Sequence, residues 1–194
     1  NAISPPSEEI IKKQQELDRL FSEIMPEEMK ALYKELSELR EKLDKNQLQK
    51  KIQDLKLSNE DIEKELDRNL EILKQLEFDQ KLEHIIDQIN KLKDDQINMA
   101  KNSVKNADEK IKDQEKSNED FEKIQSDIKD IRGLNNELDN SQKMPNTDNL
   151  ESEIKQQLNQ GLQELQENKK RRANKSQEQV GEKLEELANI FKTM

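Results

Sequence analysis

Apolar residues recur along most of the chain three or four positions apart, with polar residues between them. This period places the apolar side chains on one face of an α-helix. The clearest run is Leu32, Leu36, Leu39 and Leu43, whose alternating steps of four and three form a heptad repeat. The pattern predicts helices that bury narrow apolar stripes against one another, as in a coiled coil.

Residues 1–57 carry signals for short helices. Ser4-Pro5-Pro6-Ser7 followed by Glu8-Glu9 predicts a first helix over residues 7–24, because these prolines and carboxylates suit a first helical turn. Pro26 cannot continue that helix but suits the start of a second one. A third short helix is expected after Asp44-Lys45-Asn46. We expect all three to pack along the first half of the helix that follows.

Residues 58–142 are predicted to form one very long central helix. Ser58, with Asp61 three positions later, is typical of an N-terminal cap, and no proline follows before Pro145. The apolar seam weakens between Lys93 and Asp120, where we expect the chain to be most mobile. The seam of the whole central helix consists of Ile62, Leu66, Asn69, Leu73 and Leu76, then Leu82, Ile85, Ile89 and Leu92, and finally Phe121, Ile124, Ile128 and Ile131.

Residues 147–194 are predicted to form one C-terminal helix after the loop at residues 140–146. Asp148, with Glu151 three positions on, resembles a capping box. A long helix that follows a proline-containing turn buries its stripe by folding back on its predecessor. The predicted fold is therefore all-α, an elongated antiparallel helical hairpin or coiled-coil bundle built as one unit around the central helix.

Composition supports helices and argues against several functions. Charged residues make up 40% of the 194 positions and aromatic residues 3%, with only three glycines and four prolines, so sheets and tight turns are disfavoured. The net charge of -10 argues against binding nucleic acid or coating an anionic membrane. Without cysteine, the chain has no disulfide, thiolate nucleophile or cysteine-based metal site. No apolar stretch is long enough to cross a bilayer.

Few residues in the sequence are candidates for catalysis or for metal binding. The paired carboxylates are interpreted as solvated helix faces, because acid–base catalysis needs a pocket that separates two pKa values. His84 is the only histidine, and a metal site would need further nitrogen or sulfur ligands. We therefore predict no catalytic, cofactor-binding or metal-binding residue, and no enzyme activity in this chain. The carboxylate pairs are Glu8-Glu9, Glu27-Glu28, Asp94-Asp95 and Glu185-Glu186.

One concentrated basic patch stands out, formed by Lys169, Lys170, Arg171 and Arg172. Successive residues point around a helix and no aromatic residue is interleaved, so nucleic-acid binding is not expected. The first interpretation is a solvated face, and the alternative is a docking patch for an acidic partner or for lipid headgroups. The seam amides Asn69, Gln114 and Asn118 are interpreted as buried groups that set register, with a ligand channel as the alternative.

The stretch from Glu28 to Leu82 resembles the helical region of a bacterial family of very large, membrane-anchored proteins of unknown function, rich in Glu, Lys, Leu and Gln. The resemblance rests on Leu57-Ser58-Asn59-Glu60-Asp61, on Glu65-Leu66-Asp67-Arg68-Asn69-Leu70 and on Lys74-Gln75-Leu76-Glu77-Phe78. It covers about a third of the chain. It implies a cell-envelope protein, the periplasmic side being favoured, with membrane attachment through regions outside this chain and no catalytic residues to carry over.

The leading hypothesis is a structural or scaffolding rod of a larger envelope protein, which binds protein partners, or a second copy of itself, through its helix faces. Since the chain begins without a methionine, we expect it to be a fragment or a mature product. The polar seams and the weak segment between Lys93 and Asp120 motivate a second hypothesis, a holdase-type chaperone or adaptor that clamps client proteins. A third hypothesis is a non-catalytic arm of a larger enzyme.

Overall fold

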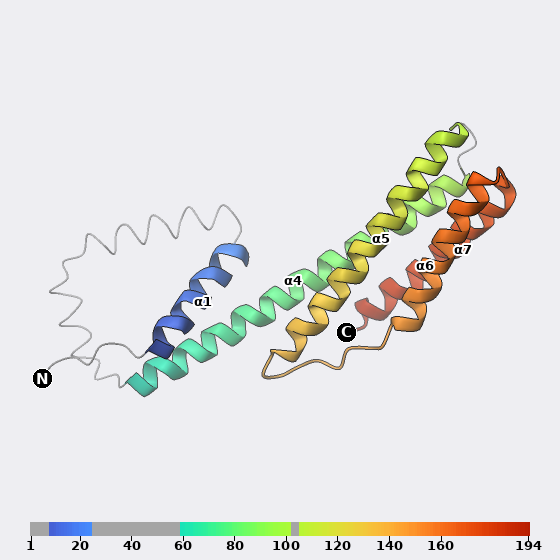
Figure 1. Cartoon of the computed structure of the whole chain (residues 1–194). Coiled ribbons are helices and arrows are strands. Elements are labelled where there is room, and N and C mark those ends of the chain that lie inside the picture. Colours follow the sequence, from blue (N-terminus) through green and yellow to red (C-terminus); the bar gives the residue numbers. More distant parts are fainter. Residues whose placement is uncertain (1–7, 25–58, 102–104) are drawn as a thin grey trace, which may run out of the picture. The chain divides into compact units, whose positions relative to one another are not determined.

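The computed structural model describes residues 8–24, 59–101 and 105–194, and all regular secondary structure in these ranges is α-helical (Figure 1). The all-α prediction is confirmed. The predicted second and third short helices, with Leu32, Leu36, Leu39 and Leu43, lie outside the described residues. The helices are α1 (Glu8–Ile24), α4 (Asn59–Lys101), α5 (Ala107–Asn136), α6 (Asp148–Gln166) and α7 (Lys170–Lys192). The chain divides into two compact units, Asn1–Glu77 and Phe78–Met194.

In the first unit, α1 lies beside the beginning of α4. Lys13 of α1 pairs with Asp67 of α4 (Nζ to Oδ1, 2.7 Å), and Lys74 of α4 pairs with Glu16 of α1 (Nζ to Oε1, 4.0 Å). The two pairs advance along both helices in the same order, so α1 and this part of α4 run in the same direction. Leu20 of α1 is fully buried. The first helix begins within one residue of its predicted start and ends at the predicted Ile24.

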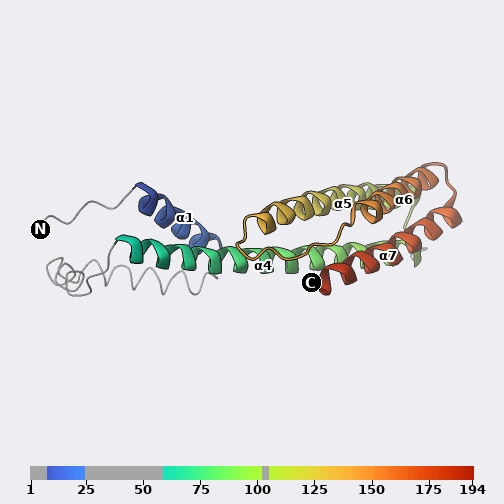
Figure 2. The same cartoon turned by 90° about the horizontal axis from the view of Figure 1, so that it is seen from below.

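The second unit is a four-helix bundle made of residues 78–101 of α4 together with α5, α6 and α7 (Figures 1 and 2). Consecutive helices run in opposite directions, the up-down-up-down arrangement that short connections favour. α6 packs against both α5 and α7. α7 approaches α4 closely at Gly181, where an added Cβ would lie 3.0 Å from Cγ1 of Ile97.

The predicted long helix is present as α4, but its predicted extent over residues 58–142 is wrong, because α4 ends at Lys101 and the chain reverses into α5. Asn106 caps the new helix: its side chain accepts a hydrogen bond from the backbone N–H of Glu109 (2.9 Å). The Glu109 carboxylate in turn accepts one from the backbone N–H of Asn106 (3.3 Å). This capping box satisfies backbone donors that a helix start leaves free, and so stabilises a break in the weakest part of the seam.

The prediction of a single C-terminal helix over residues 147–194 is also wrong, because this segment forms two helices, α6 and α7. Asn168 adopts a left-handed backbone conformation with φ 58°. The N–H of Asn168 donates to the carbonyl of Leu165 (3.0 Å), and the N–H of Lys169 donates to that of Glu164 (2.7 Å). These two bonds form a Schellman motif, in which asparagine replaces the usual glycine. The motif ends α6 and allows α7 to fold back along it.

The core of the second unit has an apolar half and a polar half. The apolar half lies toward the connection between α5 and α6. The predicted stripe of Phe121, Ile124, Ile128 and Ile131 is confirmed as part of its core. Toward the α4–α5 and α6–α7 turns, most of the buried side chains are polar. The apolar half also contains Ile85, Ile89, Leu92, Ile154, Leu158, Val180, Leu184, Leu187 and Phe191. The polar half contains Gln96, Lys110, Gln114, Ser117, Glu164, Ser176 and Gln177.

Candidate functional site

The predicted basic patch lies at the turn between α6 and α7. Lys169 pairs with Glu167 through a short hydrogen bond, which lowers the pKa of the Glu167 carboxyl below its ordinary value; a further hydrogen bond from Gln163 contributes. Lys170, Arg171 and Arg172 are exposed and form no ion pair with any described residue. The first turn of α7 contains no acidic residue, so its free N–H groups and these cations add to the same positive field.

The four basic side chains and Asn168 surround one open hollow of about 580 Å³. The sequence interpretation held that successive residues diverge around the helix. At a helix N-terminus, however, every Cα–Cβ bond is tilted toward that end, so side chains of the first turn reach beyond it. The patch is thus a continuous positive surface, and no aromatic side chain contributes to it.

A buried layer of glutamines crosses the polar half of the bundle. Gln177 of α7 donates a hydrogen bond from Nε2 to Oε1 of Gln114 on α5 (2.9 Å), and both side chains are buried. Gln96 of α4 has 0% exposure, and neither of its amide atoms has a hydrogen-bond partner. The Oε1 atom of Gln177 is also buried without a partner. This layer is the least satisfied part of the core.

A hydrogen-bonded belt extends from the layer to α6. Gln114 donates to Asn118 (3.2 Å), which donates to Asn159 of α6 (2.9 Å). Ser176 of α7 donates to the buried carboxylate of Glu164 on α6 (2.7 Å). Of the three predicted seam amides, the structure brings Gln114 and Asn118 together, whereas Asn69 is exposed on α4.

A pocket of about 210 Å³ opens between α4 and α5, at the same polar end of the bundle. Asp95 and Asn98 of α4 line one side, and Lys110, Lys116 and Ser117 of α5 line the other. A second, smaller hollow of about 140 Å³ shares Asp95 with it and continues along the two helices. The groove between α4 and α5 is therefore lined mainly by charged and polar side chains.

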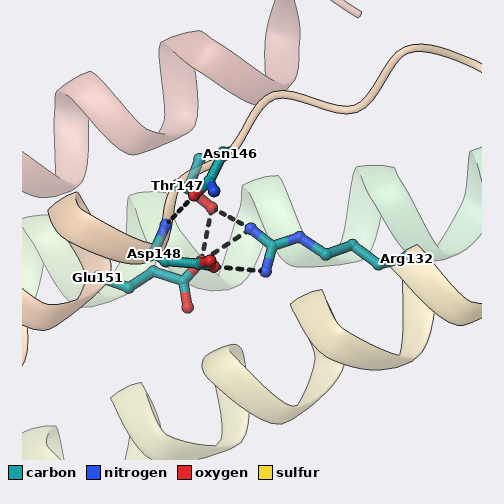
Figure 3. A network of polar contacts seen from close by, with 5 residues as sticks. All are labelled: Arg132, Asn146, Thr147, Asp148 and Glu151. Carbon is teal, nitrogen blue, oxygen red and sulfur yellow. Dashed lines mark hydrogen bonds and ion pairs between the residues drawn. The ribbon is translucent and has the colours of Figure 1, made fainter.

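A further polar network joins α5 to the start of α6 (Figure 3). The Arg132 guanidinium donates to Asp148 Oδ1 (2.9 Å), Thr147 Oγ1 (2.6 Å) and Glu151 Oε1 (3.3 Å). The Thr147 hydroxyl also donates to Glu151 (2.5 Å), and Asn146 Oδ1 accepts from the backbone N–H of Asp148 (2.9 Å). Each of the five residues bonds to another within the network, which therefore fastens the loop before α6 to α5.

The remaining sequence candidates are not gathered into a site. His84, both residues of Asp94-Asp95 and both of Glu185-Glu186 are exposed on their helices, as is Glu9. Glu27 and Glu28 lie outside the described residues. Within the described part of the chain, no three His, Cys, Asp or Glu side chains are placed to hold a metal ion.

The chain matches no protein-family model, no curated protein and no solved structure. None of the helices over residues 8–24, 59–101 and 107–192 has the length and apolar character needed to cross a membrane.

The sequence reasoning missed Gln96, Gln177 and Lys110. A signal for the two glutamines was present: Gln96 follows Leu92 by four positions, and Gln177 precedes Val180 by three, so each continues an apolar stripe. Lys110 also lies on such a stripe, since it precedes Gln114 by four positions and Phe121 by eleven, but a charged residue at a seam position does not by itself indicate burial.

Proposed function

We propose that this chain is a non-catalytic helical scaffold that binds a helix of a partner protein through α4, as part of a larger cell-envelope protein. The observation that carries the proposal is the exposure of Ile72 and Leu76, at 56% and 43%. They are four positions apart and therefore lie on one face of α4. Nine and thirteen residues beyond Leu76 on the same helix, Ile85 and Ile89 are buried in the bundle at 1% and 0% exposure.

The position of these side chains around α4 explains why α1 does not cover them. Asp67 and Lys74 face α1 through their ion pairs. At 100° per residue, Ile72 is rotated by about 140° from Asp67 and about 160° from Lys74. Ile72 and Leu76 therefore lie on the far side of α4 from α1, beside the exposed polar residues Arg68 and Asn69.

Two apolar side chains one turn apart with polar neighbours are the anchor pattern of an amphipathic helix that packs on another helix. The envelope location rests on the resemblance of residues 28–82 to the helical region of membrane-anchored bacterial proteins. The membrane attachment would then belong to regions outside this chain.

Site-specific photo-crosslinking in cells tests the proposal. A crosslinking amino acid at Ile72 or Leu76 should capture a distinct envelope protein, whose contact peptide, identified by mass spectrometry, is an amphipathic helix. The matched controls are Lys64 on α4 and Gln15 on α1, both exposed and away from the apolar pair, which should capture little. Exclusive crosslinks to residues 25–58 of the same chain, or equal yields at all four positions, would contradict it.

A further inference from the structure

The pocket between α4 and α5 contains an ammonium group in an unusual setting. Lys110 is 8% exposed, yet its side chain forms no hydrogen bond or ion pair with any described residue. It lines the pocket together with the hydroxyl of Ser117, which is also buried and also has no side-chain partner. Neither Nζ of Lys110 nor Oγ of Ser117 is enclosed without a partner, so the stem of the lysine is buried while its ammonium group opens on the pocket.

Four charged groups at the pocket and the adjoining hollow are already joined in two ion pairs. Lys105 binds Asp113 (Nζ to Oδ2, 2.5 Å), and Lys123 binds Asp120 (Nζ to Oδ1, 3.0 Å). The groups left without an ion pair are the carboxylate of Asp95 on α4 and the ammonium groups of Lys110 and Lys116 on α5. Opposite charges thus face each other across the pocket.

The arrangement restricts the ligand. A simple anion would be attracted by Lys110 and Lys116 but repelled by Asp95. A simple cation would be attracted by Asp95 but repelled by the two lysines. A molecule carrying both charges satisfies both walls. The volume of about 210 Å³ is also below the roughly 300 Å³ at which pockets for drug-sized ligands begin.

We propose that the pocket between α4 and α5 binds a small zwitterion of the amino-acid type. The ligand carboxylate would contact Lys110, Lys116 and the Ser117 hydroxyl, and its ammonium group would contact Asp95. This inference does not depend on the scaffold function, because the pocket lies in the second unit and Ile72 and Leu76 lie in the first.

Titrations of the full chain, followed by NMR at constant ionic strength, test the proposal with three probes. Glycine carries both charges, acetate only the negative one and methylammonium only the positive one. Glycine should shift the backbone amide signals of Asn98 and Ser117 in a saturable way. Acetate and methylammonium should bind at least about tenfold more weakly, because each leaves one charged wall without a partner.

Two variants assign the binding to the pocket. Lys110→Met removes the ammonium while keeping the apolar stem, and Asp95→Asn removes the carboxylate charge; each should weaken glycine binding about tenfold or more. Lys112→Met is the matched control, because Lys112 is exposed on the same helix and does not line the pocket, and it should leave binding unchanged. Circular dichroism of each variant verifies that the helices are retained. Equal binding of glycine and acetate, unchanged binding by Lys110→Met, or no saturable shift with glycine would overturn the proposal.

Discussion

Replacing Gln96 with leucine is expected to stabilise the four-helix bundle. The side chain is fully buried in α4, and neither Nε2 nor Oε1 has a hydrogen-bond partner. An amide buried without a partner costs about 1–3 kcal/mol relative to water. Leucine has a similar length and no polar atom to satisfy. The free energy of unfolding should therefore rise by about 1–3 kcal/mol.

Urea denaturation followed by circular dichroism measures the change. The midpoint should rise while the slope with denaturant stays constant, since the surface exposed on unfolding is nearly the same. Gln156→Leu is the control: Gln156 is exposed on α6, and its replacement should change the stability by less than about 0.5 kcal/mol.

Replacing Gln177 with leucine should have the opposite effect on the free energy of unfolding. Gln177 donates to Gln114, so Gln177→Leu removes a formed hydrogen bond and leaves a buried acceptor on Gln114. Because the change also removes the unsatisfied Oε1 atom of Gln177, the net loss should be about 1 kcal/mol, at the low end of the cost of an unpaired buried group. If Gln96→Leu also lost 1 kcal/mol or more, the Gln96 amide would have to be hydrogen-bonded in solution, and the reasoning from its lack of partners would be refuted.

The remaining predictions concern the two turns that divide the expected long helices. Asn106→Ala should lower the free energy of unfolding by about 1 kcal/mol in urea denaturation, because Glu109 loses its capping partner; no change would contradict the capping box. Asn168→Gly should preserve stability, whereas Asn168→Val should lower the melting temperature, because a β-branched residue disfavours φ 58°. The pKa of the Glu167 carboxyl is lower in the folded chain than the ordinary value of 4.5. Its ion pair therefore stabilises the fold fully above pH 4.5, and this stabilisation is lost as the pH falls through the pKa of the folded state. Glu167→Gln should therefore reduce the acid sensitivity of unfolding between these values, and an unchanged pH profile would count against the pair with Lys169.

The apolar period predicted the helices well and their ends less well. Phe121, Ile124, Ile128 and Ile131 were assigned to one buried stripe from spacing alone, and they are buried together. Spacing works here because each helix of the bundle presents one face to the shared core, so the apolar face and the buried face coincide. The same reasoning fails for Leu76, which was assigned to the seam and is nevertheless 43% exposed.

The turns were missed for a physical reason. No helix end was predicted after Lys101 or Gln166, and the connections there contain neither glycine nor proline. Asparagine performs both tasks instead, as a side-chain cap at Asn106 and as a left-handed residue at Asn168. The box at Asn106 and Glu109 had the same spacing as the one predicted at Asp148 and Glu151, where the prediction is wrong: Thr147 is the N-cap of α6 and no side-chain cap bond forms. The pocket could not be foreseen, because it exists only where the first of these turns brings α4 and α5 together.

The unequal halves of the bundle core lead to a prediction about local stability. Segments with few buried apolar contacts open at lower free energy than the rest of a domain. Around Gln114 and Ser117, α5 faces polar side chains with unsatisfied amides nearby, whereas around Ile128 and Ile131 it faces the apolar core. Both segments belong to one continuous helix, so their backbone hydrogen bonds are alike and only the packing differs.

Amide hydrogen exchange on α5 should therefore be at least about tenfold faster around Gln114 than around Ile128, a difference in opening free energy of about 1.4 kcal/mol. Gln96→Leu should slow exchange in the polar half and leave the apolar half unchanged, because it removes an unsatisfied amide only there. Uniform protection along α5 would show that the bundle opens as a single unit, and that the unpaired amides do not weaken the end of the molecule that contains the α4–α5 pocket.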